Sequence, residues 1–373
     1  MKNPFNYLQF AQGDLFYDRR EILADLKSRF LSGQSNVVIY GPRRYGKSSL
    51  VAELATQLEA LGFVCISFDM VKLATAKLFA ETYATRIYRR LAPVRSGVRQ
   101  IANFFKGLRP MLTVGRDGEV GFSFDPTVSE IGPEELSEVL DLPQQLAGDR
   151  RVLIVLDEFQ EVEALMPNCG FERVMRSVIQ NHHNVSYVFL GSRYHLLRRM
   201  FTDHGRPFYK SALTMLLGKP PAEESTAFVV SRFASAGIGI ADETARRLVD
   251  RIDNIPYYIQ QLGFETFRIA DEAGHAVAPP ADVDAAYDRL AGFNRDQYEQ
   301  AMLAFSTTQK KLLVALASEP TAEFDARYRA KYGLGTSSTV NSAKKKLIED
   351  GHLEVLNQRC QLADPFFAEY LRK

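Results

Sequence analysis

The segment Gly41–Ser48 reads Gly-Pro-Arg-Arg-Tyr-Gly-Lys-Ser. Four residues separate its two glycines, and a lysine and a residue with a hydroxyl group follow the second glycine. The apolar run Asn36–Tyr40 comes directly before this segment, and Ser49–Leu58, with helical spacing, follows it. In the order strand, glycine-rich turn and helix, the backbone N–H groups of the turn and the helix N-terminus bind phosphate. The segment therefore predicts an α/β domain that binds a nucleotide.

The whole loop supplies candidate ligands for ATP or ADP. Lys47 can reach the β- and γ-phosphates, and the Ser48 hydroxyl can take a place on Mg²⁺. The glycines let the backbone curl so that successive N–H groups point at the phosphates. The candidate nucleotide-binding residues of the loop are Gly41, Pro42, Arg43, Arg44, Tyr45, Gly46, Lys47, Ser48 and Ser49.

Two successive carboxylates, Asp157 and Glu158, follow the apolar run Val152–Leu156. Five consecutive apolar residues predict a strand of a parallel sheet that is buried on both faces. Ligands of open α/β sheets bind at the carboxyl ends of such strands. We therefore expect Asp157 to hold Mg²⁺ and Glu158 to polarise the attacking water in ATP hydrolysis.

The run Val185–Ser192 predicts the neighbouring buried strand, and it ends in a small polar residue. Ser192 is a candidate to sense the γ-phosphate or to hold the water, with Arg193 second; a simple turn is the alternative. Ser211–Leu217 predicts a fifth strand. Four cations between these strands could stabilise charge in the transition state, although most such residues are ordinary surface charges: Arg198, Arg199, Arg206 and Lys210.

The segment before the phosphate loop predicts an entry helix, with Asp18 as its N-cap and Glu21 as capping-box partner. Phe16, Tyr17 and Arg19 either cover the adenine or pack this helix.

Between the two chemical elements, the run Phe63–Asp69 predicts a strand, and residues 75–92 and 133–147 predict helices. Two alternating runs within Met111–Phe124 flank Arg-Asp-Gly and predict a β-hairpin inserted into the nucleotide domain.

Residues 221–290 have the spacing of successive helices and predict a helical lid after the sheet. Pro256 stands in the first turn of one of these helices. A helix start in a lid can contact a nucleotide, which makes Pro256 a candidate contact; an ordinary capped helix is the alternative.

Residues 306–365 predict a winged helix: helices over 307–317, 322–332 and 336–350, then a hairpin of the runs 352–356 and 359–363. The third helix directs apolar residues to the core and leaves polar and basic residues outside. Such a face suits a DNA groove and its phosphates, and binding to protein or autoinhibition is the alternative. The candidate DNA contacts are Ser337, Asn341, Lys344 and Lys345.

The chain has 46 basic and 45 acidic residues, so no global field drives it onto nucleic acid or membranes. Any DNA contact must then come from a local patch. The cysteines, Cys65, Cys169 and Cys360, lack metal-ligand spacing and fit free thiols in a reducing cytosol. No apolar run approaches the about 18 residues of a membrane helix, which predicts a cytoplasmic protein without a membrane partner.

These motifs, in this order, resemble the archaeal-type ATPase family, a branch of the STAND P-loop NTPases close to AAA+ proteins and origin-recognition initiators. The resemblance implies the phosphate loop at Gly41–Ser48, Mg²⁺ and water handling by Asp157 and Glu158, a lid contact near Pro256 and a C-terminal winged helix. It covers nearly the whole chain. Its matching stretches are Phe16–Glu21, Gly41–Leu50, Val155–Gln160, Leu190–Ser192, Asn254–Gln260 and Asp364–Leu371.

We therefore expect an α/β P-loop NTPase core of the AAA+ or STAND type over residues 1–220, with a parallel sheet and an inserted hairpin. A helical lid over 221–295 and a winged helix over 296–373 follow. Lys47, Glu158 and Ser192 are the candidate catalytic residues, Ser48 and Asp157 the candidate Mg²⁺ ligands, and Arg19 and Pro256 further candidate nucleotide contacts. The expected function is an ATP-hydrolysing switch that binds duplex DNA. The alternative is a STAND-type signalling or scaffold ATPase with little intrinsic hydrolysis, whose winged helix binds protein. The candidate partners besides DNA are a protein or, in an ATP-dependent homo-oligomer, further copies of this chain.

Overall fold

The computed structural model describes residues 1–8, 13, 16–17, 19–33, 36–92, 110–114, 120–124, 130–166, 170–321, 323–356 and 358–373. The chain forms two compact units. The first, called the core unit here, comprises Arg20–Gly41 and Lys47–Leu217. The second, called the C-terminal unit, comprises Met1–Arg19, Pro42–Gly46 and Gly218–Lys373.

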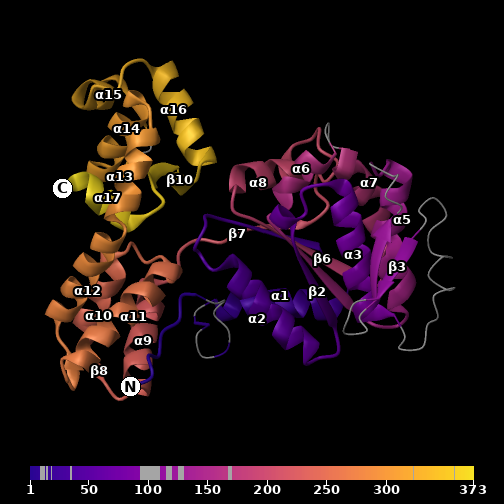
Figure 1. Cartoon of the computed structure of the whole chain (residues 1–373), viewed down its shortest axis with the longest axis horizontal. Helices are drawn as coiled ribbons and strands as arrows, with labels where there is room; N and C mark the ends of the chain where they lie inside the picture. The colour runs from indigo at the N-terminus through magenta and orange to yellow at the C-terminus, as the bar shows by residue number, and fades with distance from the viewer. Residues whose placement is uncertain are drawn as a thin grey trace. The chain divides into compact units, whose positions relative to one another are not determined.

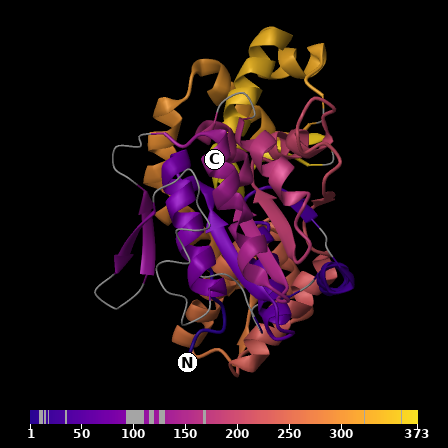
Figure 2. The ribbon, with the colours of Figure 1, turned by 90° about the vertical axis from the view of Figure 1, so that its right-hand side faces the viewer.

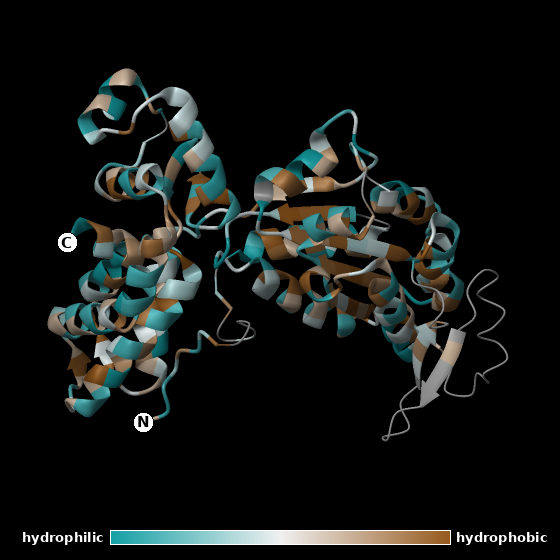
Figure 3. Cartoon of the chain, turned by 45° about the horizontal axis from the view of Figure 1, so that its top comes forward, coloured by the Kyte–Doolittle hydropathy of each residue, from teal (hydrophilic) through white to brown (hydrophobic). Residues whose placement is uncertain are grey.

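The core unit is built on a sheet with the strand order β2-β5-β6-β1-β7, in which all neighbours are parallel. All but the edge strands consist almost wholly of apolar residues, as the brown strands in Figure 3 show. Such strands need cover on both faces. The strands are β1 (Asn36–Tyr40), β2 (Val64–Asp69), β5 (Val152–Asp157), β6 (Val185–Gly191) and β7 (Leu213–Leu216).

Helices cover both faces of this sheet (Figure 1). From β1 the chain passes through α2 and crosses β6 and β5 to reach β2. It then returns in the opposite direction through the later helices to β5, β6 and finally β7. Right-handed crossovers therefore place α2 on one face, with α1 against it, and the returning helices on the other. The helices are α1 (Arg20–Ser32), α2 (Lys47–Glu59), α3 (Ala76–Leu91), α5 (Pro133–Ala147), α6 (Val162–Leu165), α7 (Gly170–Ile179) and α8 (Tyr194–Thr202).

The alternation of side chains along each strand divides the core between these faces. Val38, Ile154 and Phe189 belong to one large apolar cluster with α3, α5 and α7. Their neighbours Val37 and Leu153 are equally buried but do not belong to that cluster. Both faces of the sheet are thus closed by apolar contacts, and polar side chains gather at its ends.

The predicted hairpin is confirmed as an antiparallel ribbon of β3 (Pro110–Val114) and β4 (Val120–Phe124). Its Arg-Asp-Gly turn lies outside the described residues. The backbone N–H groups of Phe122 and Phe124 donate to Thr85 Oγ1 and Glu81 Oε1 on α3, each at 2.9 Å. These bonds attach the ribbon to α3, outside the main sheet (Figure 2).

The C-terminal unit begins with a group of helices in the predicted lid. The N-terminal segment packs into them, because Phe5 is 2% exposed and a Cβ on Gly263 would lie 2.6 Å from its ring. A side chain at Gly263 would therefore displace the Phe5 ring. The elements are α9 (Ala222–Ser235), α10 (Asp242–Arg251), α11 (Pro256–Glu272) and α12 (Pro280–Phe293), with the short pair β8 (Gly239–Ile240) and β9 (Val277–Ala278).

The winged helix follows, and its wing is the antiparallel pair of β10 and β11. The second helix was predicted from Ala322 but begins at Ala326, because the side chain of Asp325 caps it by accepting from Tyr328 N at 2.7 Å. A further helix, α13, precedes the predicted three. The elements are α13 (Arg295–Ala304), α14 (Thr307–Ser318), α15 (Ala326–Tyr332), α16 (Ser337–Glu349), β10 (Leu353–Leu356), β11 (Arg359–Leu362) and α17 (Pro365–Arg372).

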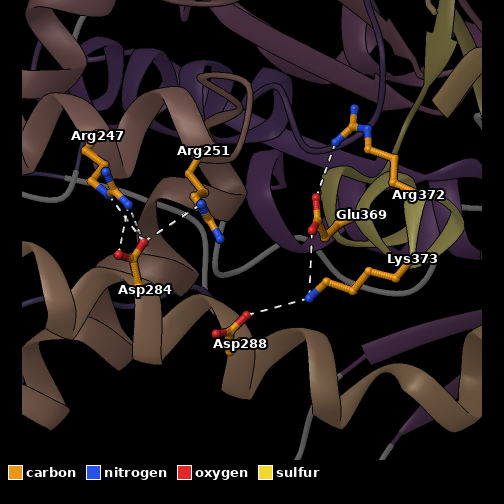
Figure 4. Close-up of polar contacts among 7 residues, drawn as sticks. All are labelled: Arg247, Arg251, Asp284, Asp288, Glu369, Arg372 and Lys373. Atoms are coloured by element: carbon orange, nitrogen blue, oxygen red, sulfur yellow. Dashed lines mark hydrogen bonds and ion pairs between the residues drawn. The ribbon is translucent and has the colours of Figure 1, made fainter. Parts of the chain in front are cut away.

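Ion pairs within this unit join helices of the lid to one another and connect the lid to the last residue of the winged helix (Figure 4). Asp284 on α12 accepts from Arg247 of α10 at 2.8 Å and lies 3.8 Å from Arg251. Asp288, one turn further along α12, lies 3.8 Å from Lys373. Exposed pairs contribute only about 0–1 kcal/mol each. The joint is therefore held mainly by the apolar cluster that lid and winged helix share.

Within the described part of the chain, no helix combines the length and the apolar character needed to cross a bilayer. Cys65 and Cys360 are free thiols there, and Cys169 lies outside the described residues.

Candidate functional site

The phosphate loop joins β1 to α2, and its backbone explains its glycines. Gly46 has φ +83°, a left-handed conformation that side chains rarely adopt. A Cβ on Gly41 would lie 2.5 Å from the carbonyl oxygen of Leu217, which no relaxation of a side chain can relieve. Arg44 also has a positive φ, 69°, so the loop is held in a strained turn without help from a third glycine.

Lys47, the first residue of α2, is the buried cation of this loop. It is 6% exposed, and its Nζ donates to the carbonyl oxygen of Gly41 at 2.8 Å. A buried ammonium group at a helix N-terminus makes this place strongly attractive for an anion. Ser49 follows in the first turn of α2 and is half-buried.

Ser48 and Asp157 meet, as expected from their positions after β1 and at the end of β5. Ser48 Oγ donates to Asp157 Oδ2 at 2.9 Å. Burial, together with the charge of Glu158, raises the pKa of Asp157 despite this hydrogen bond. Because Asp157 is partly buried and its negative charge is only partly balanced by its neighbours, this carboxylate is suited to bind a cation.

This pair of oxygen donors fits Mg²⁺. The described residues contain no group of three or more histidine, cysteine or acidic side chains that could hold a metal ion by themselves. Mg²⁺ commonly binds through one or two carboxylates together with waters and substrate phosphates. Ser48 and Asp157 therefore suit an ion that arrives with a nucleotide.

Glu158 lies beside this pair, and the end of β6 holds its carboxylate. Its Oε2 accepts from Ser192 N at 3.0 Å, from Ser192 Oγ at 2.9 Å and from Gln160 Nε2 at 2.6 Å. Burial alone would raise the pKa of Glu158, but these hydrogen bonds and the charge of Lys47 leave it below the ordinary value. The carboxylate is therefore ionised at neutral pH.

Sequence reasoning placed Ser192 beside Glu158 but missed Gln160. The signal was present, because Gln160 ends the stretch Val155–Gln160 that carries the family resemblance. Arg193, the second candidate after Ser192, instead forms an ion pair with Glu161.

The tip of the phosphate loop, Pro42–Gly46, belongs to the C-terminal unit. Arg44 lies over the rings of Tyr257 and Tyr258, 5.3 and 4.9 Å from their centroids, and pairs with Asp364 at 3.3 Å. Pro256 begins α11, and the N–H of the next residue, Tyr257, donates to Arg44 O at 3.3 Å. The start of α11 thus contacts the loop backbone.

Tyr45 binds the wing. Its side chain is fully buried, and its hydroxyl donates to Glu354 Oε1 of β10 at 2.7 Å. Gln361 of β11 donates to the same oxygen at 2.6 Å. Burial raises the pKa of Glu354 more than these hydrogen bonds lower it. A residue of the phosphate loop therefore forms part of the core of the winged-helix region.

The remaining candidate nucleotide contacts also lie in this unit. Arg19, with φ 58°, donates to Gly218 O at 2.9 Å, and a Cβ on Gly46 would lie 3.2 Å from its guanidinium. Tyr17 stacks on Phe228 of the lid with centroids 3.9 Å apart, which favours packing over a base contact. Pro42 is buried and Arg43 is exposed.

Among the four candidate cations of the core unit, Arg206 forms ion pairs with two glutamates, one of them buried. It pairs with the buried Glu172 of α7 and lies 3.5 Å from Glu163. Arg199 pairs with Asp203 at 3.1 Å. Arg206 is thus a partner of a buried carboxylate and is not available to a phosphate in this arrangement.

Glu172 makes stability depend on pH. Burial raises its pKa to about 7 from 4.5, although Arg206 acts against the shift. Because the folded pKa is the higher one, the stabilising contribution is complete below pH 4.5 and is lost as the pH rises through 7. We expect the free energy of unfolding to lose roughly 3 kcal/mol over this window, and Glu172→Gln to remove that loss. Urea unfolding at about pH 5 and pH 8 measures it; equal pH dependence in both proteins would contradict the assignment.

The third helix of the winged helix, α16, presents the candidate DNA contacts. Ser337, Asn341 and Lys345 are exposed, whereas Lys344 is half-buried over the ring of Phe324 at 5.2 Å. Lys345 lies 3.9 Å from Glu349 one turn later in the helix. Lys346 is similarly 3.5 Å from Asp350. The basic face is therefore partly neutralised by its own helix.

Two family models match this chain. The model of a family described as novel STAND NTPase 1 matches residues 4–310, and that of a probable winged helix domain matches residues 296–373. Among curated proteins, no sequence matches this chain.

Solved structures resemble the whole chain. The Walker-type ATPase PABY2304 of Pyrococcus abyssi is 18% identical, with a TM-score of 0.68, over 99% of this chain and 100% of that chain. The ORC2 protein of Aeropyrum pernix in ADPNP–ADP complexes is 14% identical, with a TM-score of 0.60, over 99% and 95%. The Aeropyrum pernix ORC1 protein in complex with DNA is 16% identical, with a TM-score of 0.53, over 96% and 93%. At these identities the likeness shows the fold alone, and it confirms the predicted P-loop ATPase core with a C-terminal winged helix.

Proposed function

Because this chain belongs to the novel STAND NTPase 1 family, we propose that it is an ATP-binding and ATP-hydrolysing switch whose winged helix binds duplex DNA. One observation carries the proposal. Lys47, Ser48, Asp157 and Glu158 come from two distant stretches of sequence and form one linked polar group at the ends of β1 and β5. This group offers a cation for phosphates, oxygen ligands for Mg²⁺ and a base for water.

Each residue then has a defined task in hydrolysis. Ser48 and Asp157 would hold Mg²⁺, which neutralises charge on the β- and γ-phosphates when bound. Lys47 adds positive charge where the phosphoryl group is transferred. Glu158 orients the water and takes its proton as the water adds to the γ-phosphorus. The bond to the β,γ-bridging oxygen breaks, and the products are ADP and phosphate.

The phosphate loop also supplies a route from the nucleotide to the winged helix. Gly41 and Lys47, which flank the tip, belong to the core unit, while Arg44 and Tyr45 are held by side chains of the lid and the wing. A nucleotide that favours one conformation of the loop changes the stability of these tip contacts. Differential affinity for two loop conformations is sufficient to shift such an equilibrium.

The DNA-binding part rests on the exposed polar face of α16 and on the fold shared with the ORC1 protein, which was solved with DNA. Changing Lys344, Lys345 and Lys346 together to alanine is expected to weaken duplex binding. Each lost phosphate contact should reduce the slope of log affinity against log salt by about 0.9. Fluorescence anisotropy over a salt series measures both effects.

A charge-matched control removes three lysines of the core unit, Lys27, Lys72 and Lys77, and should leave the slope unchanged. Absence of duplex binding by the wild type at low salt would refute DNA binding. The protein-binding alternative would then gain support, since the ion pairs of Lys345 and Lys346 with their own helix reduce the positive charge of this face. Light scattering with a non-hydrolysable ATP analogue separates that case from ATP-dependent homo-oligomerisation.

A further inference from the structure

Gln160 has an unusual place for a buried amide. It lies in the single turn Phe159–Glu161 that follows Glu158, and it is 6% exposed. Its side-chain amide faces two carboxylates, because Nε2 is 2.6 Å from Glu158 Oε2 and 3.3 Å from Glu161 Oε1. Only the nitrogen end of an amide can face carboxylates without repulsion, so chemistry fixes the orientation of this group.

The surroundings of the amide oxygen, Oε1, indicate that Gln160 is placed here for its hydrogen bond to Glu158. Gln160 Oε1 is buried and accepts no hydrogen bond from the described residues. A Cβ on Gly191 would lie 2.2 Å from this oxygen and 2.9 Å from Leu197. An alanine at Gly191, the last residue of β6, would therefore displace the amide from this position. A buried oxygen without a partner is costly, and such atoms persist where another constraint requires the residue.

Glu158 itself needs external support. Its backbone is left-handed, with φ 53° and ψ 45°, which a residue with a long side chain adopts only when its surroundings enforce it. Gln160 and Ser192 both donate to the same carboxylate oxygen, Oε2. Charged groups around the Glu158 carboxylate are Asp157, the preceding residue, and Lys47 of α2. The Glu161–Arg193 pair lies beside Gln160.

We propose that Gln160 is a positioning residue for the catalytic base: its amide, seated against Gly191, holds the Glu158 carboxylate in the orientation from which it activates water. Gln160 does not touch the nucleotide in this assignment. It acts through Glu158, and Ser192 supplies the second fixed point. The inference rests on the proposed ATP hydrolysis for its kinetic consequence, but the hydrogen bond that it invokes can be tested without turnover.

The kinetic test compares steady-state ATP hydrolysis by the full chain and by Gln160→Met, which keeps the length of the side chain but removes the donor. We expect kcat to fall by about 10–100-fold, because small misplacements of a base have effects of this size. KM and the Kd for a fluorescent ATP analogue should stay within about twofold. Gln160→Glu should lower kcat at least as far, since a carboxylate would face Glu158. Gln145→Met, the same change at an exposed position of α5, should have no effect.

The second test is a double-mutant cycle in thermal unfolding at neutral pH. Gln160→Met should lower the Tm by about 2–4 °C in the wild type and have little effect in a Glu158→Ala background, because the partner is already absent. Gly191→Ala should reproduce the kcat loss by displacing the amide.

An unchanged kcat, or losses of kcat and nucleotide affinity in proportion, would overturn the positioning role. Equal Tm losses in both backgrounds would also overturn it. If the wild type binds ATP but shows no turnover, the hydrolysis in the proposed function fails. The cycle then still decides whether Gln160 holds Glu158.

Discussion

Glu158→Gln is expected to reduce steady-state ATP turnover by about 10²–10⁴-fold, the contribution of a positioned general base. The amide keeps the size of the carboxylate and can still accept from Ser192 N, but it cannot take a proton from water. The Kd for ATP should remain within about threefold, because Lys47, Ser48 and Asp157 are untouched. A phosphate-release assay and a titration with a fluorescent ATP analogue measure the two quantities.

Glu163→Gln is a matched control for this change, since it makes the same substitution at a residue whose side chain is 55% exposed. It should retain wild-type turnover. Wild-type turnover in Glu158→Gln would instead show that another group activates water. An equal loss of nucleotide affinity would show that the substitution disturbs the loop and not the base.

Phe159→Ala should have the largest effect on stability, a loss of about 3–5 kcal/mol in the free energy of unfolding. The ring is fully buried, and its centroid lies 4.6 Å from that of Phe189, 6.1 Å from Phe201 and 5.6 Å from Phe208. Alanine leaves a cavity that these rings cannot all fill. Urea denaturation measures the change.

Phe293→Ala provides the comparison, because that ring is 69% exposed and its removal should alter stability by no more than about 0.5 kcal/mol. Because Phe159 stands between Glu158 and Gln160, its loss should also lower turnover. A destabilisation below about 1 kcal/mol would mean that the aromatic cluster does not hold this segment.

Local signals predicted the core unit well. The apolar run before Asp157 and the glycine spacing of Gly41–Ser48 each determine their own strand or loop, because burial on both faces and positive φ angles restrict the residue types allowed. The positions of Asp157 and Ser48 then follow, since parallel strands place their carboxyl ends at one edge of the sheet.

Contacts that depend on distant partners could not be predicted in this way. Tyr45 fitted a phosphate loop from the sequence, and its buried partner Glu354 lies 309 residues away. Gln160 is marked in the sequence only as the end of the stretch Val155–Gln160 that carries the family resemblance. No periodicity or spacing assigns it a role, because that role comes from the packing of one amide against Gly191. The start of α15 was placed too early, since capping by Asp325 outweighs the helical propensity of the residues before it.

The central claim, that this chain is a DNA-coupled ATP switch, is tested most directly by steady-state ATP turnover of the wild type with and without duplex DNA, with Glu158→Gln as the blank. Our account predicts turnover above the blank that rises when DNA is added. Bound nucleotide with no turnover above the blank in either condition would contradict it. The winged helix would then be assigned to a protein partner.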